Sequence, residues 1–231
     1  MVFVTGDTHG DPNRLSKSVL KSLNEGDTLI VCGDFGFIWD KSKSEQKFLK
    51  SLSKRKYNIC FIDGTHENFD LLNAYPITTW NGGKVHRISD NIFHLTRGQV
   101  FEIDGLKIFT MGGGESPDLD SRLEDNPWLK YEIPSKEELL EGAANLEKHD
   151  CKIDVIITHE PSSTIKGFLK LGESDAVRVT TLNAYFDELS KCSEFKRWFF
   201  GCLHLDKYIS NTYIGVHKAV VNAHTGERVS F

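Results

Sequence analysis

Residues 2–9 read Val-Phe-Val-Thr-Gly-Asp-Thr-His, a short apolar run that passes directly into a glycine, an acidic side chain and an imidazole. The pattern recurs, because apolar residues 28–32 lead into Gly33-Asp34 and residues 57–62 lead into Asp63-Gly64. Short apolar runs that are bounded by turn residues are typical of buried strands. We therefore predict three buried strands, each of which ends at a glycine and a polar residue.

Helical patterns separate these predicted strands. The apolar residues between positions 15 and 23 recur at helical spacing and predict a helix; they are Leu15, Val19, Leu20 and Leu23. Residues 43–55 predict a charged helix and residues 68–73 a short one. Alternating strands and helices favour a parallel sheet covered by helices, and in such a sheet ligands bind beyond the carboxyl ends of the strands.

The middle of the chain changes to a pattern of antiparallel strands. Turn residues separate four strand-like runs, at residues 85–88, 92–95, 99–103 and 106–111. Asp104-Gly105, between the last two runs, is a strong signal for a two-residue hairpin turn. The following residues, 112–134, are polar and predict a long surface loop. Long ordered loops are often functional, so we expect this loop to form one wall of a site and to influence specificity.

The second half returns to strands and helices. Ser135, with Glu138 three residues later, predicts a capped helix start, and residues 181–191 predict another helix. Residues 153–158 predict a buried strand that ends at His159, and residues 195–200 predict one that ends at Gly201. Strand-like runs in residues 208–222 complete the chain.

The composition bounds the class of protein. A chain of 231 residues suits one α/β domain spanning residues 1–231. Its formal net charge of -5 argues against stable nucleic-acid binding, which usually needs a basic surface.

The five cysteines are odd in number and scattered, so we expect reduced thiols and a cytoplasmic location. The first residues show neither a basic segment nor a long apolar run, so we expect no export signal and no membrane span.

Five predicted strand ends carry aspartate or histidine beside a glycine or at the strand end itself. These residues are Asp7 and His9, Asp34, His66 after Gly64-Thr65, His159, and His204 after Gly201-Cys202. Aspartate and histidine are ligands that borderline divalent cations prefer, and glycine lets the backbone bring such ligands close together. Two such cations can hold the attacking and leaving oxygens of a phosphoryl group. The residues therefore predict metal-dependent phosphoryl chemistry.

The order of these motifs resembles that of the calcineurin-like metallophosphoesterases. In that family D-x-H is followed by G-D, G-N-H-[DE], H and G-H-x-H, and the match here runs from Asp7 to His204. The resemblance implies an α/β fold of four layers, with two facing mixed sheets flanked by helices. It also implies hydrolysis of a phosphomonoester or phosphodiester, on a small or nucleotide-like substrate, by a metal-bound hydroxide.

The resemblance also implies a role for each matching residue. Asp7, His9 and His204 would bind the first of two divalent cations, drawn from Mn, Fe, Zn or Ni. Asp34 would bridge both cations and His159 would bind the second. His66 would protonate the leaving oxygen or contact the phosphate.

Two positions depart from the family pattern. Thr65 replaces the asparagine that binds the second cation, and Cys202 replaces the first histidine of the last motif. Each has two readings: Thr65 is a ligand or a helix cap, and Cys202 is a soft ligand or a small buried apolar residue. The alternative function is therefore a catalytically weakened metal-binding scaffold of the same fold. A nuclease is a third reading, against which the acidic balance argues.

The residues around the motifs narrow the family further. Asp34 is followed by Phe35-Gly36-Phe37, which lacks the Asp-Arg-Gly of the protein phosphatases of this superfamily. The closer resemblance is to small bacterial and phage members, and the oligomeric state is left open. Glu67 could orient a neighbouring group or cap the following helix, and of the two we expect the cap. We also expect His86 and His94 to be surface or packing residues and the aromatic residues around Trp198 to lie in the core. Arg97 and Arg122 could contact a phosphate, but we expect them to be solvated.

Overall fold

The structure is a computed structural model that describes residues 1–18, 20–116, 131–169 and 179–229. The described residues form two mixed sheets, of seven and six strands. In spatial order the first sheet contains β13 (Val220–Asn222), β1 (Val2–Thr5), β2 (Thr28–Val31), β3 (Asn58–Phe61), β6 (Ile92–Leu95), β5 (Gly83–Arg87) and β4 (Ile77–Trp80). The second contains β11 (Lys207–Tyr208), β12 (Tyr213–Gly215), β10 (Arg197–Phe200), β9 (Val155–Thr158), β8 (Leu106–Met111) and β7 (Gln99–Ile103).

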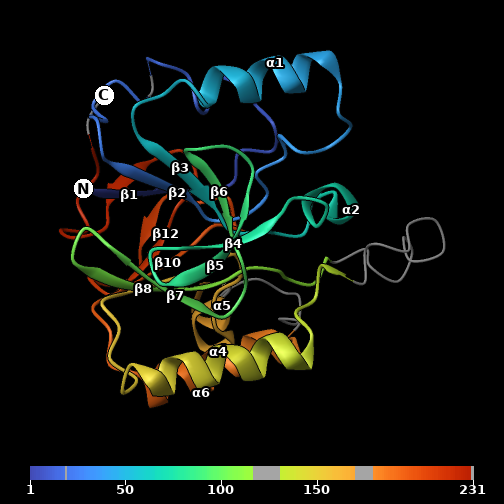
Figure 1. Ribbon diagram of the computed structural model, residues 1–231. Coiled ribbons are helices and arrows are strands. Elements are labelled where there is room, and N and C mark those ends of the chain that lie inside the picture. Colours follow the sequence, from blue (N-terminus) through green and yellow to red (C-terminus); the bar gives the residue numbers. More distant parts are fainter. Residues whose placement is uncertain (19, 117–130, 170–178, 230–231) are drawn as a thin grey trace.

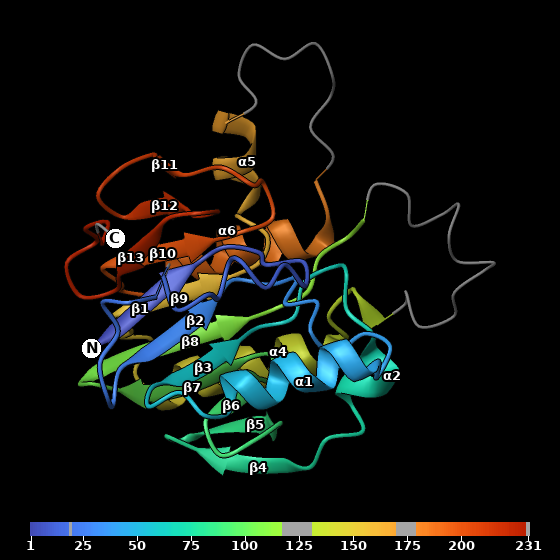
Figure 2. The same ribbon diagram turned by 90° about the horizontal axis from the view of Figure 1, so that it is seen from above.

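Parallel strands form the middle of each sheet. In the first sheet β1, β2, β3 and β6 run parallel, and in the second β8, β9, β10 and β12 do so. Figure 2 shows β1, β2 and β3 side by side. Every residue of β1, β2 and β9 is buried, because both faces of these strands are covered. The predicted buried strands are thus confirmed, although the observed strands are shorter by a residue or two at their ends.

Helices cover the outer face of each sheet, so the fold is the four-layer α/β/β/α sandwich that the family resemblance implies. α1 (Lys43–Leu52) lies on one side of the two sheets, and α4 (Lys136–Lys148) and α6 (Thr181–Cys192) lie on the opposite side (Figure 1). Two shorter helices are α2 (Phe69–Leu72) and α5 (Ser163–Leu169). In the described part of the chain, no helix combines the length and apolar character that crossing a membrane requires.

Three layers of apolar side chains hold the sandwich together. Between the sheets, residues such as Ile30 of β2 pack in one cluster with Ile157 of β9 and Phe199 of β10. A second cluster joins α1 to the first sheet, and a third joins α4 and α6 to the second. Trp198 belongs to the third cluster and is 1% exposed, which confirms the prediction that it lies in the core.

Local sequence signals account for two well-defined element boundaries. The Ser135 hydroxyl accepts a hydrogen bond from the Glu138 N–H while the Glu138 carboxylate accepts one from the Ser135 N–H, which is the predicted capping box of α4. Asp104 and Gly105 have φ angles of 51° and 74°, and both values suit a tight turn between antiparallel β7 and β8.

The predicted helix over residues 15–23 is wrong. The described residues of this segment form successive turns, although Leu15, Leu20 and Leu23 are buried as a helical pattern would bury them. Val19 lies outside the described residues. Within the segment the hydroxyls of Ser16 and Ser18 lie 3.0 Å apart.

Other elements differ from the sequence-based expectations. β4 and α5 have no counterpart among them, and most of the predicted loop over residues 112–134 lies outside the described residues, as does Arg122. The helix expected over residues 68–73 is the single turn of α2, whose N-cap is Asn68.

Arg97 is buried rather than solvated, which corrects the expectation for this residue. Its Nε and Nη2 donate hydrogen bonds to Asp63 Oδ2 at 2.9 and 2.6 Å, and its Nη1 donates one to Glu138 Oε2 at 3.1 Å. His94 Nε2 lies 3.0 Å from the other Asp63 oxygen, and His86 Nδ1 lies 2.9 Å from His94 Nδ1. Burial alone would raise the pKa of Asp63, but Arg97 and His94 hold it below its usual value. Arg97 therefore connects the end of β3 to the start of α4.

We predict that Arg97→Met destabilises the protein by about 3–5 kcal/mol, because it leaves the buried Asp63 carboxylate without its guanidinium partner. The matched control is Lys84→Ala, since Lys84 also forms an ion pair with α4, at 2.6 Å from Glu141, but in an exposed position. That control should cost less than about 1 kcal/mol. Denaturant unfolding measures both values, and equal losses in the two variants would contradict the prediction.

Candidate metal centre

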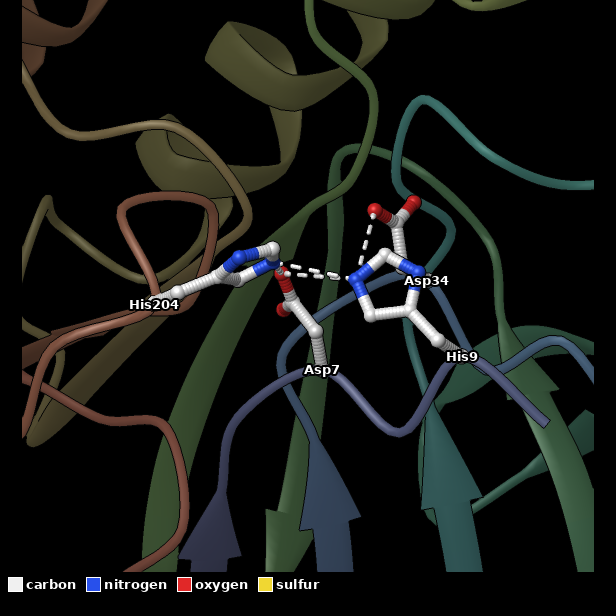
Figure 3. Close-up of side chains that lie close together, drawn as sticks. All are labelled: Asp7, His9, Asp34 and His204. Atoms are coloured by element: carbon white, nitrogen blue, oxygen red, sulfur yellow. Dashed lines mark hydrogen bonds and ion pairs between the residues drawn. The ribbon is translucent and has the colours of Figure 1, made fainter. Parts of the chain in front are cut away.

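The carboxyl ends of parallel strands from both sheets meet at one place. Asp7 follows β1 and Asp34 follows β2 in the first sheet, whereas His159 follows β9 and His204 follows β10 in the second. Figure 3 shows Asp7, His9, Asp34 and His204 with their side chains directed toward one another. The two sheets thus supply different members of one polar cluster.

Four side chains lie close enough together to share a metal ion. Asp7, His9, Asp34 and His204 each offer one ligand atom, and these atoms all lie within 4.8 Å of one another. His204 Nε2 is 3.0 Å from both Asp7 Oδ2 and His9 Nε2, and His9 Nε2 is 3.7 Å from Asp34 Oδ2. We call these four residues the metal cluster.

Three members of the metal cluster have a left-handed backbone. The φ angles are 47° at His9, 44° at Asp34 and 50° at His204. Residues other than glycine adopt such angles at a cost of about 1–3 kcal/mol each, and they persist only where the surrounding structure enforces them. The chain therefore accepts local strain at the residues that bring these donors together.

Close packing around the aspartates requires glycine at two nearby positions. A Cβ atom at Gly201 would collide with Asp7 Oδ1 and would lie 2.6 Å from the carbonyl oxygen of Cys32. A Cβ atom at Gly64 would collide with Asp34 Oδ1 and would lie 2.6 Å from the Asp34 nitrogen. The glycines of the sequence motifs thus leave the space that the two carboxylates occupy.

Asp7 is the most deeply buried donor and fits a cation well. It is completely buried, and in the described structure its Oδ2 lies 3.0 Å from His204 Nε2 and its Oδ1 lies 3.6 Å from His159 Nδ1, in ion-pair contacts that lack hydrogen-bond geometry. Burial alone would raise the pKa of Asp7, but the neighbouring His159 and His204 hold it below its usual value. A buried carboxylate of this kind needs nearby positive charge, which imidazoles or a bound cation can supply.

Asp34 is held by the segment that follows β3. Its Oδ1 accepts a hydrogen bond from the His66 N–H at 2.7 Å, and its Oδ2 lies 3.1 Å from His66 Nδ1. Burial would raise the pKa of Asp34, but His159 and the contacts with His66 lower it well below its usual range. The Thr65 hydroxyl lies 3.1 Å from the same His66 nitrogen. Asp34, His66 and Thr65 are therefore in one polar network.

Glu67 orients the backbone after Asp34, which corrects the expectation that it caps a helix. Its Oε1 accepts a hydrogen bond from the Phe35 N–H at 2.7 Å, and its Oε2 lies 3.5 Å from the Gly36 nitrogen. The cap of α2 is supplied instead by the Asn68 side chain. The signal for this role is the buried position of Glu67 beside Asp34, and the sequence spacing alone does not reveal it.

His159 lies beside the metal cluster. Its Nδ1 is 3.6 Å from Asp7 Oδ1 and 3.0 Å from the Cys32 carbonyl oxygen, while its Nε2 is 3.9 Å from Asp34 Oδ2. Burial would lower the pKa of His159, but the carboxylates of Asp34 and Asp7 raise it well above its usual value. His159, which follows a strand of the second sheet, thus lies beside both aspartates of the first sheet.

Thr65 and Cys202 are close to this region but differ in what they can offer. Thr65 is 8% exposed and contacts His66. Cys202 donates its N–H to the His159 carbonyl oxygen at 3.0 Å, and burial raises the pKa of its thiol well above the usual value. Because a bound cation would itself favour the thiolate, both readings of Cys202 stand, as a soft ligand and as a small apolar residue.

The donor set suits a borderline divalent cation. Imidazole and carboxylate groups are common ligands of Zn, Fe, Ni and Mn, and the described cluster contains both types. The geometry can therefore hold at least one cation at the junction of the two sheets, with further donors nearby.

Comparison with known proteins agrees with this geometry. The family model described as calcineurin-like phosphoesterase matches residues 1–205, which include all the motif residues from Asp7 to His204. No curated protein matches the chain significantly.

We predict that Gly201→Ala weakens Mn²⁺ binding by about 10-fold or more, because the added methyl group displaces Asp7 from the metal cluster. The control is Gly167→Ala in α5, where an added Cβ meets no atom within 4 Å. Calorimetric titration with Mn²⁺ compares the two folded variants with the unchanged protein. Unchanged affinity in folded Gly201→Ala would show that Asp7 is not held as described.

Proposed function

This chain belongs to the calcineurin-like phosphoesterase family, and we propose that it catalyses metal-dependent hydrolysis of a phosphomonoester or phosphodiester. The observation that carries the proposal is the metal cluster. Its four donors come from three separate loops at strand ends, and three of them have left-handed backbones. Such strain at converging polar residues is typical of functional sites.

The proposed ligand roles follow the contacts of each residue. Asp7, His9 and His204 would hold one divalent cation, and Asp34 would be shared with a second cation that His159 also binds. This division is supported by His159, whose Nδ1 lies 3.0 Å from the Cys32 carbonyl oxygen and whose other nitrogen, Nε2, faces Asp34 Oδ2 at 3.9 Å, while His9 Nε2 is 3.7 Å from the same oxygen. When bound, the cations would neutralise phosphate charge and lower the pKa of water.

His66 is the proposed proton donor in this reaction. Hydrolysis joins a water oxygen to phosphorus and breaks the bond to the leaving oxygen, which then needs a proton. His66 is well placed for this, because its side chain is 48% exposed whereas its Nδ1 is held by Asp34. With Nδ1 oriented in this way, Nε2 is the ring atom that would transfer the proton to the leaving oxygen.

The second cation site depends on Thr65 and Cys202 in this proposal. The asparagine expected at position 65 would offer a stronger donor than a hydroxyl, and a cysteine at position 202 is a soft ligand that suits Zn or Fe better than Mn. We therefore propose that the second cation binds more weakly than the first. The alternative of a weakened metal-binding scaffold rests on the same two residues.

We predict that the protein loaded with Mn²⁺, Fe²⁺, Zn²⁺ or Ni²⁺ hydrolyses two phosphate esters, a chromogenic aryl ester and an alkyl ester. His66→Gln should lower kcat for the alkyl ester by about 10²–10⁴-fold, because its leaving oxygen needs a proton, but should affect the aryl ester by less than about 10-fold. Steady-state rates on both esters measure this difference.

Two outcomes would count against this proposal in different ways. Absence of turnover of both esters with every cation would contradict an enzymatic function. Equal losses on the two esters in His66→Gln would contradict the proton-donor role and leave hydrolysis itself standing.

We predict that the double variant Thr65→Asn, Cys202→His binds more metal per chain and turns over faster than the unchanged protein, because it restores the two donors of the family pattern. Elemental analysis and the aryl-ester rate measure the two effects. A lower rate in a folded variant would show that Thr65 and Cys202 are adapted to their positions.

A further inference from the structure

A cavity of about 450 Å³ opens beside the metal cluster. His9 and His66 line the cavity where it meets the cluster, and residues between positions 36 and 48 line most of the remainder. This volume lies within the range of about 300–1,000 Å³ that is usual for small-molecule sites. A phosphate ester bound at the metal cluster would therefore have room for its leaving group in this cavity.

An exposed tryptophan forms part of the cavity wall. Trp39 lines the cavity and exposes 42% of its surface, which is unusual for a side chain of its size. Phe37 and Phe48 also line it, with ring centroids 4.6 Å apart. The wall thus presents aromatic surface next to a candidate catalytic centre, and such surface suits a planar ring.

The backbone around Trp39 is held rigidly at both of its polar groups. The Trp39 N–H donates to Glu45 Oε2 at 2.7 Å, and the Trp39 carbonyl oxygen accepts from Asn68 Nδ2 at 2.7 Å. Asn68 lies two residues after His66, so the same segment fixes Trp39 and the proposed proton donor. A wall that is already ordered lowers the entropic cost of binding.

The charges around the cavity argue against a second phosphate group. Among the described residues that line it, Asp40 and Glu45 bring negative charge, and no lysine or arginine is present. The start of α1 is a poor anion site as well, because Glu45 places a carboxylate in its first turn, where that carboxylate accepts hydrogen bonds from the N–H groups of residues 39–41 just before the helix. The Ser42 hydroxyl accepts a further one from the Glu45 N–H. The occupant should therefore carry no negative charge, be planar and be able to form hydrogen bonds.

We propose that this cavity binds the base of a nucleoside monophosphate, stacked on Trp39, while the phosphate lies at the metal cluster. Ser42 and Ser44 also line the cavity, and their hydroxyls lie 3.0 Å apart, so one O–H is donated within the pair and the other can be donated to the polar edge of the base. The proposal rests on the proposed phosphoesterase function and narrows its substrate class to nucleotides with a single phosphate.

The experiment compares adenosine monophosphate, as the 3′ and 5′ isomers, with glycerol phosphate, which is a phosphomonoester without a ring. In the Mn²⁺-loaded protein, Trp39→Ala should lower kcat/KM for at least one isomer of adenosine monophosphate by about 5–150-fold, which is the loss expected for one base-stacking contact. The kcat/KM for glycerol phosphate should change by less than about 2-fold. Trp39→Phe should retain most of the activity, because it keeps an aromatic ring. The matched control is Tyr208→Ala, which removes an aromatic residue that is also 42% exposed but does not line the cavity.

Equilibrium dialysis with adenosine separates this proposal from the proposed function. Adenosine carries no phosphate, so its binding tests the cavity without any hydrolysis. Weaker binding of adenosine to Trp39→Ala, with unchanged binding to Tyr208→Ala, would support the base site even if no ester were hydrolysed. Equal effects of Trp39→Ala on adenosine monophosphate and glycerol phosphate, or adenosine binding that does not depend on Trp39, would overturn the proposal while leaving phosphoesterase activity intact.

Discussion

Two buried carboxylates, Asp7 and Asp34, lie at the junction of the two sheets, and much of the surrounding structure serves to accommodate their charge. Burial raises the pKa of both carboxyls, and the charge of Asp34 raises that of Asp7 further. Nevertheless both have pKa values below the usual range, because His159, His204 and His66 surround them. The arrangement requires that strand ends from both sheets meet, since no single sheet supplies these donors.

The apolar layers supply the rigidity on which this arrangement depends. The clusters on the outer faces and between the sheets fix the strands, so their carboxyl ends cannot separate to relieve the left-handed backbones of His9, Asp34 and His204. Glu67 adds a local constraint, because its carboxylate holds the backbone that follows Asp34. Stability from packing thus maintains strain at the site, which is a common relation between a scaffold and a functional centre.

The sequence predicts much of this architecture because its signals are local. Dense apolar runs identify the buried strands, Ser135 and Glu138 identify a helix start, and Asp104-Gly105 identifies a hairpin. The order of the strand-end motifs indicates which side chains should meet, and the structure brings Asp7, His9, Asp34 and His204 together. Their role as metal ligands stays a prediction.

The features that the sequence does not predict depend on long-range contacts. The helical spacing of Leu15, Leu20 and Leu23 reflects burial, but the segment satisfies it with turns. Arg97 gives no local sign that it will meet Asp63, 34 residues earlier in the chain, inside the protein. Glu67 likewise shows its partners only when the end of β3 is placed beside the end of β2.

The most direct measurement of the central claim is anomalous diffraction from crystals grown with Mn²⁺. The structure predicts an anomalous peak among Asp7, His9, Asp34 and His204, with a second and weaker peak on the side of His159. A peak in which Asp7 and His204 take no part, or the absence of any peak near the metal cluster at saturating Mn²⁺, would contradict the assignment of this cluster as a metal centre.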